Sequence, residues 1–456
     1  MAYEMDRESG SFPLHAESEL SMTGSVSAAP GAAPIMLRAD WVFPVSGPPI
    51  ADGYLSISGG RIVSLGPAAE MPGDRAIWLR GSALIPGFVN PHAHLELSSM
   101  VGRIPRPAAD AQDFTQWIRN VLAIRQTWGL AEFDESARFG IRLMIQAGTT
   151  TVGDVTASGT TLDPLIESPM RSVVFQEVLG FGEDRRSSAL AACVAWLERA
   201  KDVGRRSGGR TRLGVSPHAP HSTSAAIYTD CCRLARDAGC LMSTHVSETK
   251  EEIRLIEEGT GPFRDFLRFR GLPMDDWSTP GVSPIRYMDL EGVLTHAGTA
   301  IHLNYLRPGD MELLVAAKMA PVYCPQSHVF LGHANHPAAA MLEKGLPLAI
   351  ATDSLASNDS LEMLDEMRVA FAHHPEVPAA TWLRGATLNS ALALQMDGEV
   401  GSLAPGKLAD FAVIHLGSSP GPEPSDPTER LLYPESRVVG TIVGGKWVFG
   451  GSPTQI

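Results

Sequence analysis

Short apolar runs alternate with helical segments through most of the chain, and this alternation constrains the fold more than any other feature. In residues 114–122 apolar side chains recur at the spacing of one helix face, whereas residues 150–152 have strand character. A strand, a helix and a further strand in succession place the two strands parallel in one sheet. We therefore expect an α/β fold in which residues 85–395 form a (β/α)₈ barrel of the TIM type. The strands we expect include 84–89, 150–152, 173–178, 213–216, 241–245, 299–302, 320–323 and 348–351.

The two ends of the chain carry a different pattern of short apolar runs cut by Gly and Pro. Gly59-Gly60 and Gly444-Gly445 are typical of tight turns between such strands. We predict a small β-sandwich domain built from both termini, with residues 35–84 before the barrel and 396–456 after it. Residues 1–34 are rich in Ser, Gly, Ala and Pro, which predicts a disordered leader.

Charge and cysteine content exclude several classes of protein. Asp and Glu number 51 against 37 Lys and Arg, so the formal charge is -14 at pH 7, which argues against binding to nucleic acid or to an anionic membrane. No apolar run is long enough to span a membrane, and the leader lacks the pattern of a secretory signal. The five cysteines form no Cys-x-x-Cys pair, which fits a reducing compartment. We expect a cytoplasmic protein, and the composition says little about its substrate.

Four of the expected strands end in residues that can bind a metal ion. His92 and His94 follow the first strand at alternate positions, so their side chains share one face. His245, His302 and Asp353 close three later strands. An isolated His-x-His pair is more often a pair of surface histidines, but the active site of such a barrel lies at the C-terminal ends of its strands. Since a charge there is costly unless paired or bound to a metal, the pattern predicts a metal site that suits zinc.

Further motifs surround these residues in a fixed order. They read PGFVNPHAHL at 86–95, PHAP at 217–220, HVSET at 245–249, HLN at 302–304, CPQS at 324–327, TDSLASN at 352–358 and GSLAPGKLAD at 401–410. Together they resemble the amidohydrolase superfamily, in its aminohydrolase and chlorohydrolase branch of metal-dependent barrel enzymes. The resemblance spans about residues 36–449 and is specific for the superfamily, not for one substrate.

The resemblance implies a role for each residue at the strand ends. It assigns the general acid/base to Glu248, which protonates a ring nitrogen and then the leaving amine, and the stabilisation of the tetrahedral centre to His302. It makes Asp353 the group that orients a water and accepts its proton, while the metal lowers the pKa of that water from ~15.7 toward ~7. One divalent metal, zinc first with iron or manganese as alternatives, is held by His92, His94, His245 and Asp353.

Two further residues are implied to touch the substrate. The segment DFTQWI at 113–118 resembles a helix that covers a nucleoside, and its Trp117 would stack on or wall in a purine ring. His218, in the PHAP motif, would be a second contact. Segments 94–98 and 324–333 resemble aminodeoxyfutalosine deaminases and related deaminases of adenosine and S-adenosylhomocysteine. The implied reaction is hydrolytic deamination of an amino-substituted purine or nucleoside-like compound, by hydroxide attack with release of ammonia.

Other functions share most of these motifs. Relatives that act on adenosine-type thioethers place a Glu about nine residues after this Trp to bind ribose hydroxyls, whereas Arg125 and Gln126 stand here. Guanine deaminase, a triazine chlorohydrolase or aminohydrolase, and a cyclic amide hydrolase such as imidazolonepropionase therefore stay open. So does a scaffold that has lost its metal, although the ligands and the proton shuttle are retained. The resemblance also implies that homodimers are common.

Several of these residues have a structural explanation as well. Glu248 has the alternative of capping the next helix, where an acidic residue is favoured. Trp117 lies on an apolar helix face and has the alternative of a core position, and His218 that of a structural hydrogen bond. His296, six residues before His302, competes for the role of that histidine.

Two more sets of residues stay open at this stage. Glu177 closes the run 173–176 and either bridges a second metal or lines the pocket. The resemblance implies that relatives with two metals often carry a carboxylated lysine there; no lysine is present here, so we expect one metal. A second metal site, a polar pocket rim or a solvated loop are alternatives for the dense group His328, His333 and His336.

Overall fold

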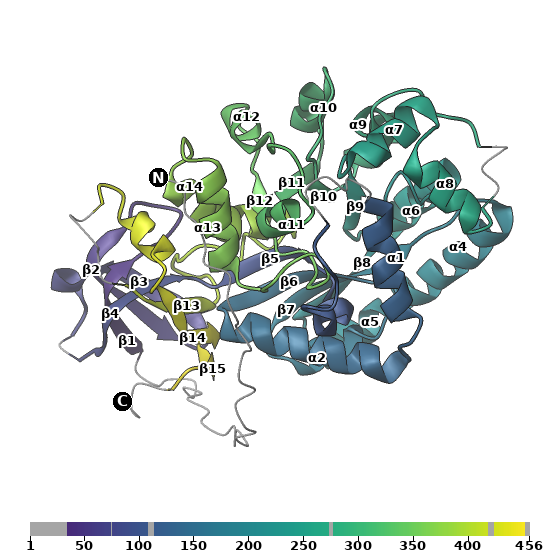
Figure 1. Ribbon diagram of the computed structural model, residues 1–456. Helices are drawn as coiled ribbons and strands as arrows, with labels where there is room; N and C mark the ends of the chain where they lie inside the picture. The colour runs from purple at the N-terminus through teal and green to yellow at the C-terminus, as the bar shows by residue number, and fades with distance from the viewer. Residues whose placement is uncertain (1–33, 74, 108–113, 273–276, 418–423, 452–456) are drawn as a thin grey trace.

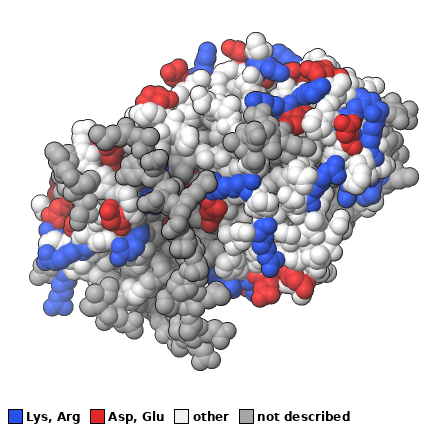
Figure 2. Space-filling view, viewed as in Figure 1, with Lys and Arg blue, Asp and Glu red and all other residues white. Residues whose placement is uncertain are grey.

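The computed structural model describes residues 34–73, 75–107, 114–272, 277–417 and 424–451, which form two sheets covered by helices (Figure 1). The disordered leader predicted for residues 1–34 lies outside this range except for its last residue, and so does position 113 of the DFTQWI segment. On the face drawn in Figure 2, basic and acidic side chains are interspersed among uncharged ones. Among the described residues no helix is long and apolar enough to cross a membrane.

The larger sheet is a parallel barrel, which confirms the predicted fold class. Its eight strands follow one another in chain order from β5 to β12, and every pair within it is parallel. A parallel bridge between Ala93 and Asp353 joins the chain after β12 to the end of β5 and closes the circle. The strands are β5 Phe88–Ala93, β6 Thr149–Thr156, β7 Arg171–Val178, β8 Thr211–Pro217, β9 Met242–Val246, β10 Gly298–His302, β11 Met319–Tyr323 and β12 Ala349–Ile350.

Helices between the strands cover the outside of the barrel (Figure 1). They begin and end where the sequence caps them: in α6 the Ser224 side chain accepts a hydrogen bond from Ile227 N, and the helix stops at Gly239 in the left-handed region. The helices are α1 Phe114–Arg125, α2 Leu130–Gln146, α3 Leu162–Glu167, α4 Glu183–Glu198, α5 Ala200–Arg206, α6 Ala225–Ala238, α7 Lys250–Glu258, α8 Pro262–Phe269, α9 Pro284–Leu290, α10 Asp310–Ala316, α11 Pro325–Phe330, α12 Ala338–Glu343, α13 Met363–His373, α14 Ala379–Arg384 and α15 Ser390–Ala393.

The second sheet contains strands from both ends of the chain, as predicted. Its order is β15-β14-β13-β4-β1-β2-β3, so that β13 from the C-terminal part pairs with β4 from the N-terminal part. Leu37, Leu55, Leu84, Phe411 and Val413 are buried in its core. The strands are β1 Ile35–Val42, β2 Ile50–Ser58, β3 Arg61–Pro67, β4 Ile77–Pro86, β13 Phe411–His415, β14 Arg437–Val443 and β15 Lys446–Phe449.

One predicted strand is wrong in its boundaries. The apolar run 84–89 reads as one strand, but β4 ends at Pro86 in the smaller sheet and β5 begins at Phe88 in the barrel. The chain passes between the sheets at Gly87, where an added Cβ would lie 2.3 Å from the Thr150 side chain. Only glycine fits so close an approach, and hydrophobicity alone does not reveal such a break. The domain boundaries drawn from the sequence stay a prediction.

A buried ion pair ties the two sheets together beside this passage. Asp410, just before β13, accepts hydrogen bonds from Arg171 Nε at 2.6 Å and Nη2 at 3.2 Å. The same carboxylate accepts from Gly444 N at 2.7 Å. The side chains of Arg171 and Asp410 are 11% and 0% exposed.

Replacing Asp410 with Ala is therefore expected to lower the free energy of unfolding by about 3–5 kcal/mol, because the substitution leaves a buried guanidinium without its partner. Urea unfolding followed by circular dichroism measures this. The control is Asp163→Ala, which removes an exposed pair with Arg206 and is expected to cost about 1 kcal/mol or less. Equal losses in the two variants would contradict the role assigned to Asp410.

Candidate active site

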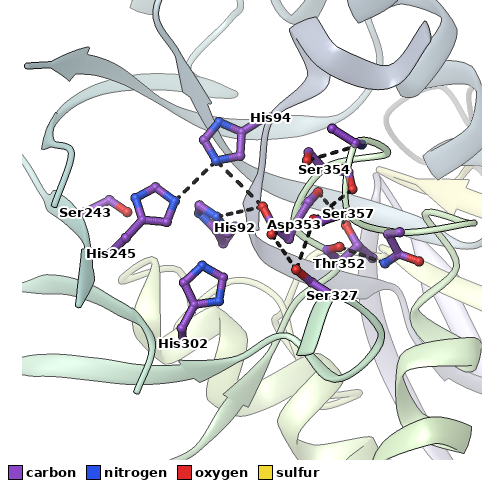
Figure 3. A network of polar contacts seen from close by, with 12 residues as sticks. His92, His94, Ser243, His245, His302, Ser327, Thr352, Asp353, Ser354 and Ser357 are labelled. Carbon is purple, nitrogen blue, oxygen red and sulfur yellow. Dashed lines mark hydrogen bonds and ion pairs between the residues drawn. The ribbon is translucent and has the colours of Figure 1, made fainter. Parts of the chain in front are cut away.

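Five ionisable side chains meet at the C-terminal mouth of the barrel (Figure 3). His92 lies on β5 and His94 directly after it, His245 and His302 lie on β9 and β10, and Asp353 follows β12. His94 Nε2 is 3.3 Å from His245 Nε2. The ring centroids of His92 and His245 are 4.8 Å apart, and those of His245 and His302 are 5.4 Å apart. The structure thus brings together all five residues that the strand-end pattern singles out.

One oxygen of the Asp353 carboxylate faces the histidines, and the other accepts hydrogen bonds from two serines. Its Oδ1 lies 3.4 Å from His92 Nε2 and 3.7 Å from His94 Nε2. Its Oδ2 accepts hydrogen bonds from Ser327 Oγ at 2.8 Å and Ser357 Oγ at 2.9 Å. Burial acts to raise the pKa of Asp353, but the facing His92 ring and the other histidines outweigh it and hold the pKa well below its ordinary value. The carboxyl group is therefore ionised.

His94, His245 and His302 favour the neutral form, which offers lone pairs to the centre of this group, because burial lowers the pKa of each ring. Burial lowers the pKa of His245 to about 4 and that of His94 well below its usual value. His245 Nδ1 donates to the His218 carbonyl oxygen at 3.0 Å, which leaves Nε2 as the acceptor facing His94. Such a bond to the outer ring nitrogen is the usual way in which a ligating histidine is oriented.

The donor set fits a divalent metal ion. His92 is fully buried, yet neither of its ring nitrogens has a hydrogen-bond partner within the described ranges. Buried polar atoms without partners are rare and call for an explanation such as an ion. Two groups have ligand atoms within 4.8 Å of one another: His92 with His245 and His302, and His92 with His94 and Asp353. Three imidazoles and a carboxylate are ligands that zinc takes.

Strained backbone supports the ends of these strands. His302, Leu303, Asp353 and Ser247 have φ values of 75°, 56°, 58° and 54°. Left-handed backbone is uncommon in residues other than glycine and is concentrated at functional sites, where surrounding contacts hold it. One such contact is the hydrogen bond from His336 Nε2 to the His302 carbonyl oxygen at 2.8 Å.

Glu248 lies beside the histidine group rather than at a helix cap. Its Oε1 is 3.5 Å from His302 Nε2, and its side chain is 8% exposed. The N-cap of α7 is Thr249, and the backbone N–H groups of Ser247 and Glu248 donate to Glu252. Burial, with the negative charge of Asp353 adding to it, raises the pKa of Glu248 well above its ordinary value. This shift favours the protonated form of the carboxyl group, the form that can donate a proton.

The two residues expected to touch the substrate lie around this group. Trp117 is partly buried on α1, and its Nε1 donates to the Ala356 carbonyl oxygen at 2.9 Å, three residues after Asp353. His218 follows β8, and its ring centroid is 4.8 Å from that of His245. Its Nδ1 lies 2.6 Å from Ser222 Oγ. Both side chains thus have a structural contact as well as a place near the site.

The other histidines weighed from the sequence lie outside the two potential metal groups. His296 precedes β10, at the opposite end from His302, and its Nε2 is 3.4 Å from Arg236. His328 contacts Asn304 Oδ1 at 3.1 Å and His333 contacts the Tyr305 hydroxyl at 3.3 Å. The rings of His328 and His333 thus hydrogen-bond to side chains of residues 304 and 305, which follow His302.

The sequence did not identify the residues whose hydrogen bonds hold the Asp353 carboxylate and the backbone before Glu248 in place. Ser327 and Ser357 bind Asp353, and Glu252 binds the backbone before Glu248. The two serines lie inside the CPQS and TDSLASN motifs, but a hydroxyl carries no spacing rule that would identify its partner. The signal was their position in these motifs, of which TDSLASN also holds Asp353.

Comparison with known proteins gives one family. The pattern that defines the Amidohydrolase family matches residues 83–448. A 5-methylthioadenosine/S-adenosylhomocysteine deaminase of Pelotomaculum thermopropionicum is 30% identical over 436 residues, with 91% of this chain and 93% of that protein covered. A protein of the same name from Moorella thermoacetica is 26% identical, with 90% and 93% covered.

Solved structures share the fold. Helicobacter pylori aminofutalosine deaminase, in complex with methylthio-coformycin, superposes with a TM-score of 0.77 at 24% identity and covers 91% of this chain and 100% of its own. An adenosine deaminase from Xanthomonas campestris with bound zinc gives a TM-score of 0.76 at 23% identity, with 92% and 93% covered.

The donor set predicts that His92→Ala loses most of its bound metal, because this ring contributes to both potential groups. Metal content per chain after zinc loading and dialysis, measured by plasma mass spectrometry, checks this. His296→Asn, which removes a histidine from the other end of β10, is the matched control and is expected to keep the parent's metal content. A His92→Ala protein with as much metal as the parent would contradict this ligand set.

Proposed function

The chain belongs to the amidohydrolase family, and from this premise we propose that it hydrolyses the amino group from an amino-substituted purine or nucleoside-like compound. The observation that carries the proposal is the Glu248 carboxyl, 3.5 Å from His302 Nε2, beside histidines and one aspartate that form two groups, each with its ligand atoms within 4.8 Å of one another. A hydrolytic deaminase needs these parts: a site for a metal, a base, and an acid that holds its proton near neutral pH. In the net reaction, water and the amine give the carbonyl product and ammonia.

His92, His94, His245 and Asp353 are the proposed metal ligands, with zinc first and iron or manganese as alternatives. When bound, such a metal supplies a Lewis acid that lowers the pKa of a water from ~15.7 toward ~7. Support for zinc comes from the donor set and from the zinc bound in the Xanthomonas campestris adenosine deaminase.

Three side chains of this protein take part in the proposed reaction: two transfer protons, and one stabilises charge. Asp353 Oδ1 faces the proposed metal group and is the oxygen placed to accept a proton from the attacking water, because Oδ2 is held by two serine hydroxyls. Glu248 donates its proton to the ring nitrogen next to the reacting carbon, then takes up the second proton of the attacking water and passes it to the leaving amine as the C–N bond breaks and the C=O bond forms. The proton that Asp353 accepted then restores the Glu248 acid. His302, 3.5 Å from the Glu248 carboxyl, stabilises the charge that develops at the tetrahedral carbon.

The substrate is a small molecule with an amino-bearing ring. Trp117 and His218 are the proposed contacts, since Trp117 is tied to the chain after Asp353 and His218 lies next to His245. The related proteins are named for 5-methylthioadenosine and S-adenosylhomocysteine, and the structural neighbour for aminofutalosine. The five cysteines are free thiols, which supports a reducing compartment such as the cytoplasm.

The proposed reaction predicts ammonia release from at least one of aminodeoxyfutalosine, 5-methylthioadenosine, S-adenosylhomocysteine, adenosine, guanine or an amino-triazine. A coupled assay for ammonia with zinc-loaded protein checks this. The panel separates the nucleoside-like substrates from guanine and the triazines. Metal-loaded protein that releases ammonia from none of them would contradict deamination and would point to amide or chloride hydrolysis.

The proton shuttle predicts that Glu248→Gln lowers kcat by about 10²–10⁴-fold, because glutamine fills the same volume but has no proton to transfer. Metal content should stay at the parent's level, since Glu248 is not among the proposed ligands. Glu258→Gln, at an exposed position on α7, is the control and should keep the parent's rate. A Glu248→Gln enzyme as fast as the parent would show that the proton passes through another group.

A further inference from the structure

A buried carboxylate without a hydrogen-bond donor lies next to the histidine group. Glu177 is the last residue but one of β7, and its side chain is 10% exposed. Its carboxyl oxygens accept no hydrogen bond from any described residue, and the nearest charged contact is His218 Nε2 at 3.8 Å from Oε1. A carboxyl group this little exposed is costly to ionise unless a donor reaches it.

Nearby charges do not compensate this carboxylate. Burial, with the negative charge of Glu96 adding to it, raises the pKa of Glu177 to about 7, and Arg125 opposes this only in part. The guanidinium of Arg125 instead contacts Glu96 Oε1 through Nη2 at 3.0 Å. The oxygens of the Glu177 carboxyl group are therefore available to hydrogen-bond a bound molecule.

The His218 ring faces Glu177 from a fixed position. Its Nδ1 is held by Ser222 Oγ at 2.6 Å, and its own backbone N–H donates to the Val178 carbonyl oxygen at 3.0 Å. Nε2 and the Glu177 carboxylate are 3.8 Å apart, too far for a direct hydrogen bond. A polar atom placed between them would contact both.

This pair belongs to the mouth of the barrel but not to the proposed metal ligands. Strand β7 pairs with β8 so that Glu177 lies opposite Ser216, and His218 follows directly after β8. The His218 ring is 4.8 Å from that of His245, centroid to centroid. In the described part of the chain, Glu177 and His218 join neither potential metal group, so their polar atoms remain for the substrate.

A hydroxyl group is the chemistry that fits this gap. An O–H group donates its one hydrogen to a carboxylate oxygen and at the same time accepts a hydrogen bond from the His218 ring when Nε2 carries the ring hydrogen. A second hydroxyl on the neighbouring carbon can donate to the other carboxylate oxygen, and a carboxylate binds the ribose of dinucleotides in this manner in other folds. An amine or a single hydroxyl would satisfy fewer of these atoms.

We propose that Glu177, together with His218, binds the vicinal sugar hydroxyls of the nucleoside-like substrate, which makes Glu177 a specificity-determining residue. This assignment rests on the proposed function. It explains why a carboxylate is kept buried on β7 without a donor of its own. It also gives the sugar a place beside the ring that the chemistry acts on.

The test compares adenosine with 2′,3′-dideoxyadenosine in the parent and in Glu177→Ala. For the zinc-loaded parent, we expect kcat/KM to be about 10- to 100-fold lower for the dideoxy compound, the effect of losing hydrogen bonds to a charged group. Glu177→Ala should lower kcat/KM for adenosine by a similar factor and leave the dideoxy compound nearly unchanged. The preference for the diol should therefore disappear in this variant.

A binding measurement checks the same point without turnover. Isothermal titration of zinc-loaded protein with inosine and 2′,3′-dideoxyinosine should show tighter binding of inosine to the parent and equal binding to Glu177→Ala. Glu177→Gln keeps the volume and removes the charge, and it serves if the alanine variant does not fold by circular dichroism. Glu198→Gln, at an exposed position on α4, is the control and should keep the parent's preference.

The outcomes separate this inference from the function on which it rests. Ammonia release with the same diol preference in the parent and in Glu177→Ala or Glu177→Gln would overturn the assignment and leave the deaminase in place. No ammonia from either nucleoside, together with no binding of inosine, would overturn both. A preference that disappears only in the Glu177 variants supports the sugar site.

Discussion

The closure of the barrel at Asp353 is the constraint on which the site depends. The Asp353 backbone N–H donates to the His92 carbonyl oxygen at 3.2 Å, and a parallel bridge links Asp353 to Ala93. The residue thus joins the last strand to the first, in a left-handed conformation with a φ of 58°. Since the same residue directs its carboxylate at the histidines, the fold cannot close in this register without completing the polar group. Ser327 and Ser357 then fix the direction of that carboxylate.

Burial of so many polar side chains is tolerable because most of them are neutral or bonded. The low pKa values of His94 and His245 keep the rings uncharged, and the raised pKa of Glu248 keeps its carboxyl protonated. Among these residues and Asp353, only the aspartate is ionised.

The parts of this structure that follow a sequence rule were predictable, and the parts that depend on contacts between distant residues were not. Strand ends of a parallel barrel lie at one mouth, so the spacing of His92, His94, His245, His302 and Asp353 was enough to bring them together. The break at Gly87 depends on the side chain of one residue on a neighbouring strand. The contact of Arg125 with Glu96 joins α1 to the chain after β5, and periodicity holds no information on such pairs.

The mouth of the barrel holds the proposed metal group and, beside it, the proposed sugar contacts, and the connection between them passes through the backbone. His218 orients His245 by its carbonyl oxygen, which accepts the Nδ1 hydrogen at 3.0 Å, while the His218 side chain points to Ser222 and Glu177. Every residue has a carbonyl, so a change of side chain at this position alters the contacts to a substrate but keeps the hydrogen bond that orients His245. A fold built in this way can change its substrate while the geometry of its reactive centre is retained, which is consistent with one barrel architecture serving nucleoside deaminases and triazine hydrolases alike.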